Sequence, residues 1–289
     1  MVEEQLLRVA LHVEQHLREP LTVERLAEVA CISEYHFHRL FRLWTGEPVI
    51  EYVRRLRLEH AAYRLRATRR SVRMIALDVG YESADAFGRA FRERFAVSPS
   101  EYRRRWAGSD VASVRASFPV RRDEQAEELV IPVSVQTLTR WSLVCLRRTG
   151  PYQQVWLAWR ELGEWVHAHA PMLADAPRIG ISHDDPAMVD RDRIRYDACH
   201  AVPAAHAASV KALIRPPFYW REMPAGDYAI TRHRGPYHEL GQAYRRLFLE
   251  WLPGSGRYPA DAPVVERYLD SPNEVREEEL RTDLLLPLL

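Results

Sequence analysis

The chain has 289 residues, 47% of them hydrophobic, and a formal net charge of +1. At about 100–200 residues per domain this length allows two domains, and the composition excludes wholesale disorder. No stretch approaches the ~18 apolar residues of a membrane span, residues 1–30 lack a secretion-signal pattern, and three scattered cysteines exclude a disulfide framework, so a cytoplasmic protein with no membrane partner is expected.

Residues 1–106 are predicted to fold as short α-helices. Apolar residues recur at helical spacing from Leu6 to Leu17 and again between 49 and 65, and Pro20 ends the first of these helices. A third helix is expected to bury Phe37 and Trp44. Four hydroxyl residues are placed to cap the helices that follow them, namely Thr22, Ser33, Ser71 and Ser83. The sequence therefore predicts an all-α domain over 1–106.

The helical region repeats itself at an offset of 50 residues. The residues that recur are Val29, Ser33, Phe37, Arg39, Phe41, Arg42, Glu51, Tyr52, Arg54 and Arg55, matched by Val79, Ser83, Phe87, Arg89, Phe91, Arg92, Glu101, Tyr102, Arg104 and Arg105. Each copy has the helix-turn-helix pattern of DNA-binding proteins. A plain helical hairpin is the alternative for a single copy, but two matching copies favour a double helix-turn-helix.

The second helix of each copy is expected to enter the major groove of double-stranded DNA. Its outward residues, predicted to contact DNA, are Tyr35, His38, Arg39 and Arg42 in the first copy and Asp85, Gly88, Arg89 and Arg92 in the second. An arginine in such a place can donate two hydrogen bonds to one guanine. The alternative for Arg39 and Arg89 is an ion pair within the helix, with Glu34 or Asp85.

Basic residues are concentrated between the two copies. Within 54–73 a single acid, Glu59, accompanies a run of arginines: Arg54, Arg55, Arg57, Arg64, Arg66, Arg69, Arg70 and Arg73. Such a run fits a stripe that binds phosphate, and it fits equally a solvated helix face.

Short motifs occur throughout the helical region: Leu21-Thr22-Val23, Leu26-Ala27, Ser33-Glu34-Tyr35-His36-Phe37-His38-Arg39-Leu40-Phe41, Ile75-Ala76, Gly80-Tyr81-Glu82-Ser83, Phe87-Gly88-Arg89-Ala90-Phe91, Phe95, Ser98-Pro99 and Tyr102-Arg103. They give residues 4–106, roughly, a resemblance to the AraC/XylS family of transcription regulators. This resemblance implies a regulator whose two recognition helices enter successive major grooves. The glutamine and threonine usual at the start of the second recognition helix are replaced by Ala84, Asp85 and Gly88, so this helix is expected to bind mainly through arginines and backbone amides.

Residues 107–132 have the composition of a linker, and a second domain is predicted over 133–289. Alternating residues predict strands over Val133–Leu138 and Ser142–Arg148, with a helix after Gly150-Pro151-Tyr152. This half repeats at 85–86 residues, and Gly235-Pro236-Tyr237 is the second copy of that tripeptide. A duplicated strand–helix–strand unit of the α+β class is expected, with a pocket at the seam between its copies.

The second half resembles the GyrI-like small-molecule-binding domain over roughly residues 126–289. The repeated Gly-Pro-Tyr and the closing segment Arg281–Leu288 carry the resemblance, and the order of the two domains is that of the Rob-type architecture. It implies a lipophilic, often cationic, ligand between the repeats. It also implies an acid opposite the cation in the final strand, here Asp283. A carboxylate among aromatic rings attracts a cation by charge pairing and by cation–π interaction.

The residues expected to line this effector site are Asp283, Asp197, Trp156, Trp159, Tyr219, Trp220, Tyr228, Tyr244 and Tyr268. The alternative for the aromatic residues is a plain apolar core. For the two aspartates it is ion pairs with Arg195 and Arg281. No cofactor, metal site or catalytic residue is expected, and Ser182-His183-Asp184 is interpreted as a turn because adjacency in one loop is not triad geometry.

The whole sequence predicts a DNA-binding transcription regulator whose C-terminal domain binds a small effector, with RNA polymerase as a further partner. Two alternatives stay open. One is a GyrI-like hydrolase in which Asp283 performs acid–base chemistry with Tyr228 or Tyr268. The other is a protein-interaction module that binds no effector.

Overall fold

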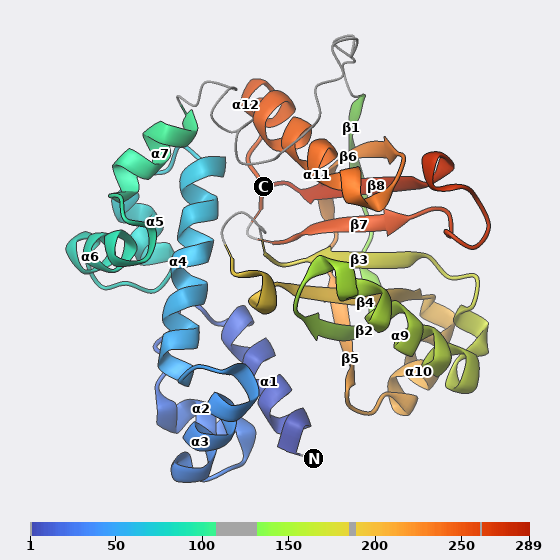
Figure 1. Ribbon diagram of the computed structural model, residues 1–289, viewed down its shortest axis with the longest axis horizontal. Coiled ribbons are helices and arrows are strands. Elements are labelled where there is room, and N and C mark those ends of the chain that lie inside the picture. The colour runs from blue at the N-terminus through green and yellow to red at the C-terminus, as the bar shows by residue number, and fades with distance from the viewer. Residues whose placement is uncertain (1, 108–131, 185–188, 261) are drawn as a thin grey trace. The chain divides into compact units, whose positions relative to one another are not determined.

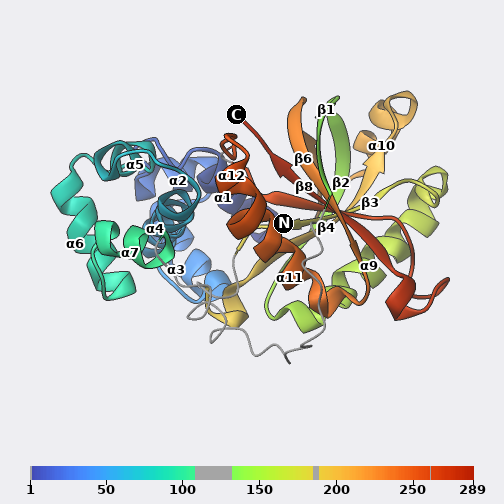
Figure 2. The same cartoon turned by 90° about the horizontal axis from the view of Figure 1, so that it is seen from above.

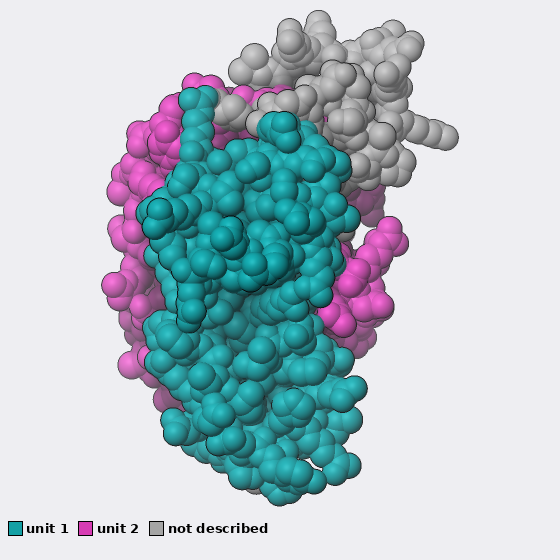
Figure 3. Space-filling view, turned by 90° about the vertical axis from the view of Figure 1, so that its left-hand side faces the viewer, with its two compact units in different colours: residues 1–122 teal, residues 123–289 magenta. Residues whose placement is uncertain are grey.

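A computed structural model of the chain describes residues 2–107, 132–184, 189–260 and 262–289. The chain divides into two compact units, Met1–Arg122 and Asp123–Leu289, which Figure 3 shows in different colours. Residues 108–131 of the predicted linker 107–132 lie outside the described residues. Within the described part of the chain, no helix has the length and apolar character needed to cross a membrane.

The first unit is helical throughout its described residues (Figure 1). Its helices are α1 (Val2–Gln15), α2 (Val23–Ala30), α3 (Glu34–Thr45), α4 (Val49–Ala67), α5 (Val72–Asp78), α6 (Ala84–Phe95) and α7 (Pro99–Ala107). The pairs α2–α3 and α5–α6 are the two helix-turn-helix copies, and the long helix α4 joins them. The all-α prediction is confirmed.

Local sequence explains where these helices begin and end. Thr22, Ser71 and Ser83 each accept a hydrogen bond from a backbone N–H of the first turn, at 3.1 to 3.3 Å, as predicted. Ser33 precedes α3 with an extended backbone but makes no such bond. Gly80 ends α5 with a φ of +83°, and a Cβ there would lie 2.6 Å from a carbonyl oxygen, so the chain requires glycine at this position.

Equivalent phenylalanines form the core of the two copies. Phe37 and Phe41 of α3, and Phe87 and Phe91 of α6, have no exposed surface. The two ring centroids of each pair lie 5.6 and 5.4 Å apart. Trp44 was expected inside, but it keeps 38% of its surface exposed because it covers Phe41 edge-on from outside.

The described residues of the second unit form an eight-stranded antiparallel sheet with helices. The strands are β1 (Val133–Leu138), β2 (Trp141–Thr149), β3 (Arg178–Ser182), β4 (Arg195–Val202), β5 (Phe218–Met223), β6 (Gly226–Arg234), β7 (Val264–Tyr268) and β8 (Arg281–Pro287). The main helices are α9 (Val155–His169), α10 (Ala207–Leu213), α11 (Leu240–Arg245) and α12 (Leu252–Gly254), with a π-helical segment Arg246–Trp251 between the last two. The α+β prediction is confirmed.

The strand order β1-β6-β8-β7-β3-β4-β2-β5 has the symmetry of the predicted duplication. Outward from the centre, β3, β4 and β2 correspond to β7, β8 and β6. The flanking strands are exchanged, since β5 pairs with β2 and β1 pairs with β6. The two repeats therefore share one sheet, and their seam is the antiparallel pair β3–β7.

Helices α9 and α11 cover the same face of this sheet (Figure 2). One apolar cluster joins α9 and α10 to β2 and β4, and another joins α11 to β6 and β8. Tyr196 of the first cluster, Ser182, and Val264 of the second stand opposite one another across β4, β3 and β7. Because residues directly opposite one another point to one side, both clusters lie on one face. We call it the helical face.

Candidate functional sites

The predicted recognition residues of α3 lie in solvent. Tyr35, His38, Arg39 and Arg42 are all exposed, Tyr35 to 77%. Their equivalents on α6 behave alike, with Asp85, Arg89 and Arg92 exposed and Gly88 half-buried.

The intrahelical ion pairs considered for these arginines are absent. Among the described residues, neither Arg39 with Glu34 nor Arg89 with Asp85 approaches within ion-pair distance. Both guanidinium groups are therefore available to a partner outside the helix.

Three arginines of the run 54–73 bind groups inside the first unit and do not form a charged surface. Arg55 pairs with Glu47 at 2.7 Å, and Arg64 pairs with Asp78 at 3.0 Å. Arg57 donates to two backbone carbonyl oxygens at 2.9 and 2.6 Å. Neither a phosphate-binding stripe nor a solvated face is correct for these three side chains, because their partners come from elsewhere in the unit.

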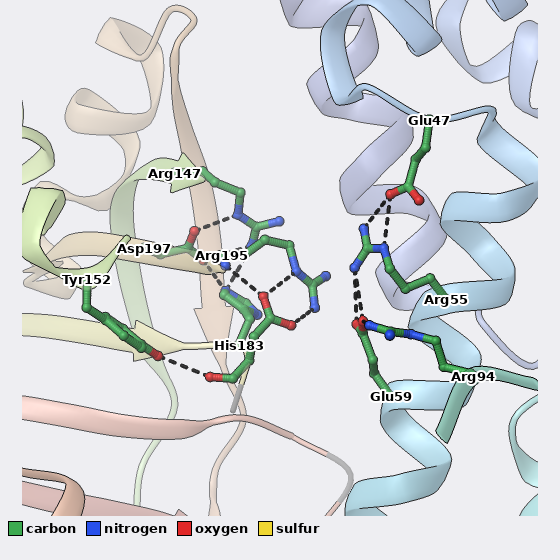
Figure 4. Close-up of polar contacts among 10 residues, drawn as sticks. Glu47, Arg55, Glu59, Arg94, Arg147, Tyr152, His183, Arg195 and Asp197 are labelled. Atoms are coloured by element: carbon green, nitrogen blue, oxygen red, sulfur yellow. Dashed lines mark hydrogen bonds and ion pairs between the residues drawn. The ribbon is translucent and has the colours of Figure 1, made fainter. Parts of the chain in front are cut away.

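A buried ionic chain connects the two helix-turn-helix copies through α4 (Figure 4). Arg55 of α4 donates to Glu47, in the turn after α3, and also to Glu59 of α4 at 3.1 Å. Arg94 of α6 approaches Glu59 to 3.9 Å. Side chains of Arg55, Glu47 and Glu59 keep only 7 to 11% of their surface exposed. The chain fixes both recognition helices against α4.

In the second unit, a carboxylate lies buried at the seam between the repeats. Glu266 of β7 is on the helical face and 5% exposed. Its Oε1 accepts hydrogen bonds from Ser182 Oγ at 2.9 Å and from Tyr244 OH at 2.7 Å, and its Oε2 accepts from Tyr268 OH. Among the described residues no arginine, lysine or histidine pairs with Glu266.

The hydrogen bonds around Glu266 continue outward as a chain of donors. Tyr268 uses its proton for Glu266, so Tyr196 OH donates to Tyr268 at 2.8 Å and accepts from Trp159 Nε1 at 3.2 Å. Burial, and then the charge of Glu266, raises the pKa of Tyr196 and Tyr268 well above the usual range, so both stay protonated. We call Glu266, Ser182, Tyr244, Tyr268, Tyr196 and Trp159 the Glu266 cluster.

A glycine in the first repeat makes room for this cluster. Gly180 of β3 stands directly opposite Glu266 and is its counterpart in the duplication. A Cβ at Gly180 would lie 2.2 Å from the hydroxyl of Tyr196 and 2.8 Å from that of Tyr268. Only a residue without a side chain lets both hydroxyls approach the seam, so the site has one carboxylate and not two.

The structure brings together three of the residues predicted to line the effector site. These are Trp159, Tyr244 and Tyr268. Trp156 is 57% exposed and stacks with Arg160 at 5.1 Å, and Trp220 lies beside Lys211 of α10 at 5.4 Å.

The other four lie on the face opposite the helices, because they alternate with residues of the helical face. They are Tyr219, Tyr228, Asp197 and Asp283.

The two aspartates are paired with arginines, although not with the predicted ones. Asp197 binds Arg147 at 2.7 Å, and Asp283 binds Arg232 at 2.7 Å, while Arg267 approaches Asp283 to 2.6 Å (Figure 4 shows Asp197). Burial alone would raise the pKa of Asp283, but these two arginines lower it.

Arg195 and Arg281, the predicted partners of these aspartates, bind other carboxylates. Arg195 binds Asp184, and Arg281 binds Asp270 at 2.8 Å, with the backbone N–H of each arginine donating to the same carboxylate. This second bond fixes the arginines away from Asp197 and Asp283.

Glu266 is the residue that sequence reasoning missed. Glu266 shares its side of β7 with Val264 and Tyr268, and this alternation is the only signal in the sequence that points to a carboxylate among apolar residues there. The same alternation separates Ser182, which bonds Glu266, from His183, which bonds Asp197 at 2.6 Å on the other face. No catalytic triad forms there.

Two other chemical possibilities lack the necessary geometry. Tyr228 donates to the carbonyl oxygen of Pro224, and Tyr268 donates to Glu266, so neither contacts Asp283. Throughout the described ranges, no three His, Cys, Asp or Glu side chains gather as a metal site.

Comparisons with known proteins match both halves of the chain. The GyrI-like small molecule binding domain matches residues 131–289, and a helix-turn-helix domain matches residues 26–105. The transcriptional regulator Rob of Salmonella typhimurium is 33% identical over 96% of this chain and 95% of its own length. The regulatory protein SoxS of the same organism is 39% identical over 32% of this chain and 87% of its own. An AraC-type regulator structure from Chromobacterium violaceum is 28% identical, covering 37% of this chain and 96% of its own, with a TM-score of 0.35.

Proposed function

The chain belongs to the transcription regulators that join an AraC-type helix-turn-helix region to a GyrI-like small-molecule-binding domain, and from this premise we propose that its effector is a lipophilic cation bound at the Glu266 cluster. One observation carries the proposal. Glu266 is a buried carboxylate that has hydrogen-bond donors around it but no cationic partner among the described residues.

The physical argument concerns the charge. Removing an ionised carboxylate from water costs several kcal/mol unless an opposite charge or many hydrogen bonds compensate. Three hydroxyl groups supply bonds to Glu266 but no net positive charge. A cationic ligand supplies that charge, and the cluster also contains the aromatic rings of Trp159, Tyr196 and Tyr268, whose faces attract a cation.

A rhodamine ethyl ester, which is a lipophilic cation, tests this proposal with the full chain. At about 100 times its Kd it is expected to stabilise the second unit by about 2.7 kcal/mol, seen as a rise in Tm. Glu266→Gln keeps the shape of the side chain but removes the charge, and it is expected to weaken binding about 30-fold or more.

Asp283→Asn is the matched comparison, since Asp283 is the acid that the sequence suggested. Retained binding in Asp283→Asn together with lost binding in Glu266→Gln supports the Glu266 site. The reverse result would assign the cation to Asp283. No shift with any cation would favour an interaction module without an effector.

We propose further that α3 and α6 contact successive major grooves through the exposed residues described above. Arg39→Ala is expected to cost about 1–3 kcal/mol of operator binding and to relax specificity at one base step, measured by titration against operator variants. Arg8→Ala on α1 is the control, because among the described residues this side chain pairs with Glu4 at the surface. Unchanged affinity and unchanged base preference in Arg39→Ala would show that the recognition face is wrongly assigned.

The remaining parts of the proposal follow from this arrangement. The DNA-binding domain comprises 1–106, the linker 107–132 and the effector domain 133–289. Effector binding changes operator affinity or contact with RNA polymerase in the cytoplasm, and no reaction is catalysed. The relatives, which are transcription regulators, and the separation of Asp283 from Tyr228 and Tyr268 support binding over hydrolysis.

A further inference from the structure

A second unpaired charge lies near Glu266 on the helical face. Arg178, the first residue of β3, stands directly opposite Tyr268 of β7 and is therefore the diagonal cross-strand neighbour of Glu266. Diagonal neighbours are about 7–8 Å apart, within reach of long side chains. Among the described residues, however, Arg178 makes neither an ion pair nor a hydrogen bond.

Glu266 does not turn toward Arg178 because its oxygens are already held. Ser182 and Tyr244 donate to one oxygen, and Tyr268 donates to the other. The seam thus carries a carboxylate and a guanidinium group that are close to one another and yet unpaired. Such an arrangement presents a negative and a positive site to a third molecule.

The duplication shows that these two charges are features of the seam and not of each repeat. At the offset of 86 residues, the counterpart of Glu266 is Gly180 and the counterpart of Arg178 is Val264. Each charge therefore occurs once. On the helical face the seam is therefore negative in the middle, at Glu266, and positive at one end, at Arg178. Two identical repeats would not produce this separation of charge.

The groups around Arg178 leave its positive charge without a bound anion among the described residues. His200 of β4 stands directly opposite Arg178 and is 6% exposed, and within the described ranges its buried Nδ1 has no hydrogen-bond partner. Burial, and then the charge of Arg178, lowers the pKa of His200 to about 4, so the imidazole is neutral and adds no charge beside Arg178. Asp270, the carboxylate whose pKa Arg178 also lowers, is already bound by Arg281.

We propose that the effector site is dipolar and takes a zwitterion, with the cation of the ligand at Glu266 and an acidic group at Arg178. This inference rests on the proposed function and specifies its ligand class. The acidic group accepts a charge-assisted hydrogen bond from the guanidinium group.

Two dyes that differ in one group test the proposal on the full chain. A rhodamine ethyl ester is a cation, and the free acid of the same dye is a zwitterion at neutral pH. Fluorescence anisotropy is expected to give a Kd at least about tenfold lower for the acid, as a charge-assisted bond predicts. The ethyl group favours the ester by its apolar surface, so this comparison works against the proposal.

Arg178→Met keeps the unbranched stem and removes the charge. It is expected to abolish the preference for the acid and not to weaken binding of the ester, because the cation of the ester is attracted by Glu266 and repelled by Arg178. Arg191→Met, at an exposed arginine of the same unit, is the control and should retain the preference.

The outcomes separate this inference from the proposed function. If the ester binds through Glu266 but the acid binds no more tightly, or if the preference survives Arg178→Met, the acidic subsite does not exist while the cation site stands. If neither dye binds, or if both bind equally well to Glu266→Gln, the proposed function fails and this inference fails with it. The wild-type comparison alone can overturn the inference, whatever the stability of the variants.

Discussion

Asp197→Asn is expected to destabilise the second unit by about 3–5 kcal/mol. Asp197 has no exposed surface, and it binds Arg147 at 2.7 Å and His183 at 2.6 Å, both only 7% exposed (Figure 4). The amide removes the negative charge that faces the buried guanidinium group of Arg147. The loss is measured as a lower midpoint of urea unfolding, followed by tryptophan fluorescence because most tryptophans lie in this unit.

The duplication provides a matched control for this variant. Asp283 is the counterpart of Asp197 and is also buried, but its partners Arg232 and Arg267 keep 53% and 26% of their side chains exposed. Water can therefore solvate both arginines in Asp283→Asn, and the cost should be clearly smaller. Equal costs at the two positions would mean that burial of the partners does not set the energy of these pairs.

The stability that Asp197 and its partners contribute depends on pH, and the direction of this dependence follows from the pKa of Asp197. Burial would raise the pKa of Asp197, but Arg147 and His183 hold it well below the usual range. The unfolded chain binds this proton near pH 4 and the folded chain only at lower pH, so the contribution is complete above about pH 4 and is lost below it. The difference in unfolding free energy between wild type and Asp197→Asn should accordingly shrink as the pH falls below about 4.

Local signals sufficed to predict the helices and the duplication. Caps such as Thr22 and Ser83 act within one turn, and helical spacing reports burial within one element. The repeat of Gly150-Pro151-Tyr152 as a second Gly-Pro-Tyr identified two equivalent units, and the pairing of β3 with β7 joins them. Such features need no knowledge of how distant elements meet.

The tertiary structure was needed to decide which acid lies on the helical face, Glu266 of β7 or Asp283 of β8. Glu266 shares its side of β7 with Val264 and Tyr268, and Asp283 shares its side of β8 with Leu285, so each strand alone allows either side to be the inner one. The position of α11 decides the matter, because it covers the face that carries Glu266 and Leu284 and leaves Asp283 on the other. A strand pattern states which residues share a face but not which face a helix covers.

The interpretation of the arginine run 54–73 as a charged surface was wrong for Arg55 and Arg57 for a related reason. Charge along the sequence does not reveal that Arg55 meets Glu47 across the turn after α3, or that Arg57 bonds carbonyl groups 40 and 38 residues earlier. A run of like charge is solvated only where no acid or carbonyl group from another element reaches it. The exposed Arg39 and Arg89 were predicted correctly as outward-facing because their environment depends on a single helix.

Arg55→Met is expected to cost the first unit about 3–5 kcal/mol of unfolding free energy. Methionine retains much of the apolar stem but removes the guanidinium group that binds both Glu47 and Glu59, whose side chains are only 11% and 7% exposed. Circular dichroism at 222 nm, which reports mainly on the helices, follows this loss during urea unfolding.

Arg54→Met, one residue earlier on α4, is the control. Arg54 pairs with Glu93 of α6, whose side chain is 69% exposed, and a surface pair of this kind contributes about 0–1 kcal/mol. Because the chain Glu47–Arg55–Glu59–Arg94 connects both recognition helices to α4, Arg55→Met should also weaken binding to a complete operator at temperatures where the unit is still folded. Equal stability losses in the two variants, or an Arg55→Met protein that binds its operator normally, would show that the buried chain does not hold the two recognition helices in place.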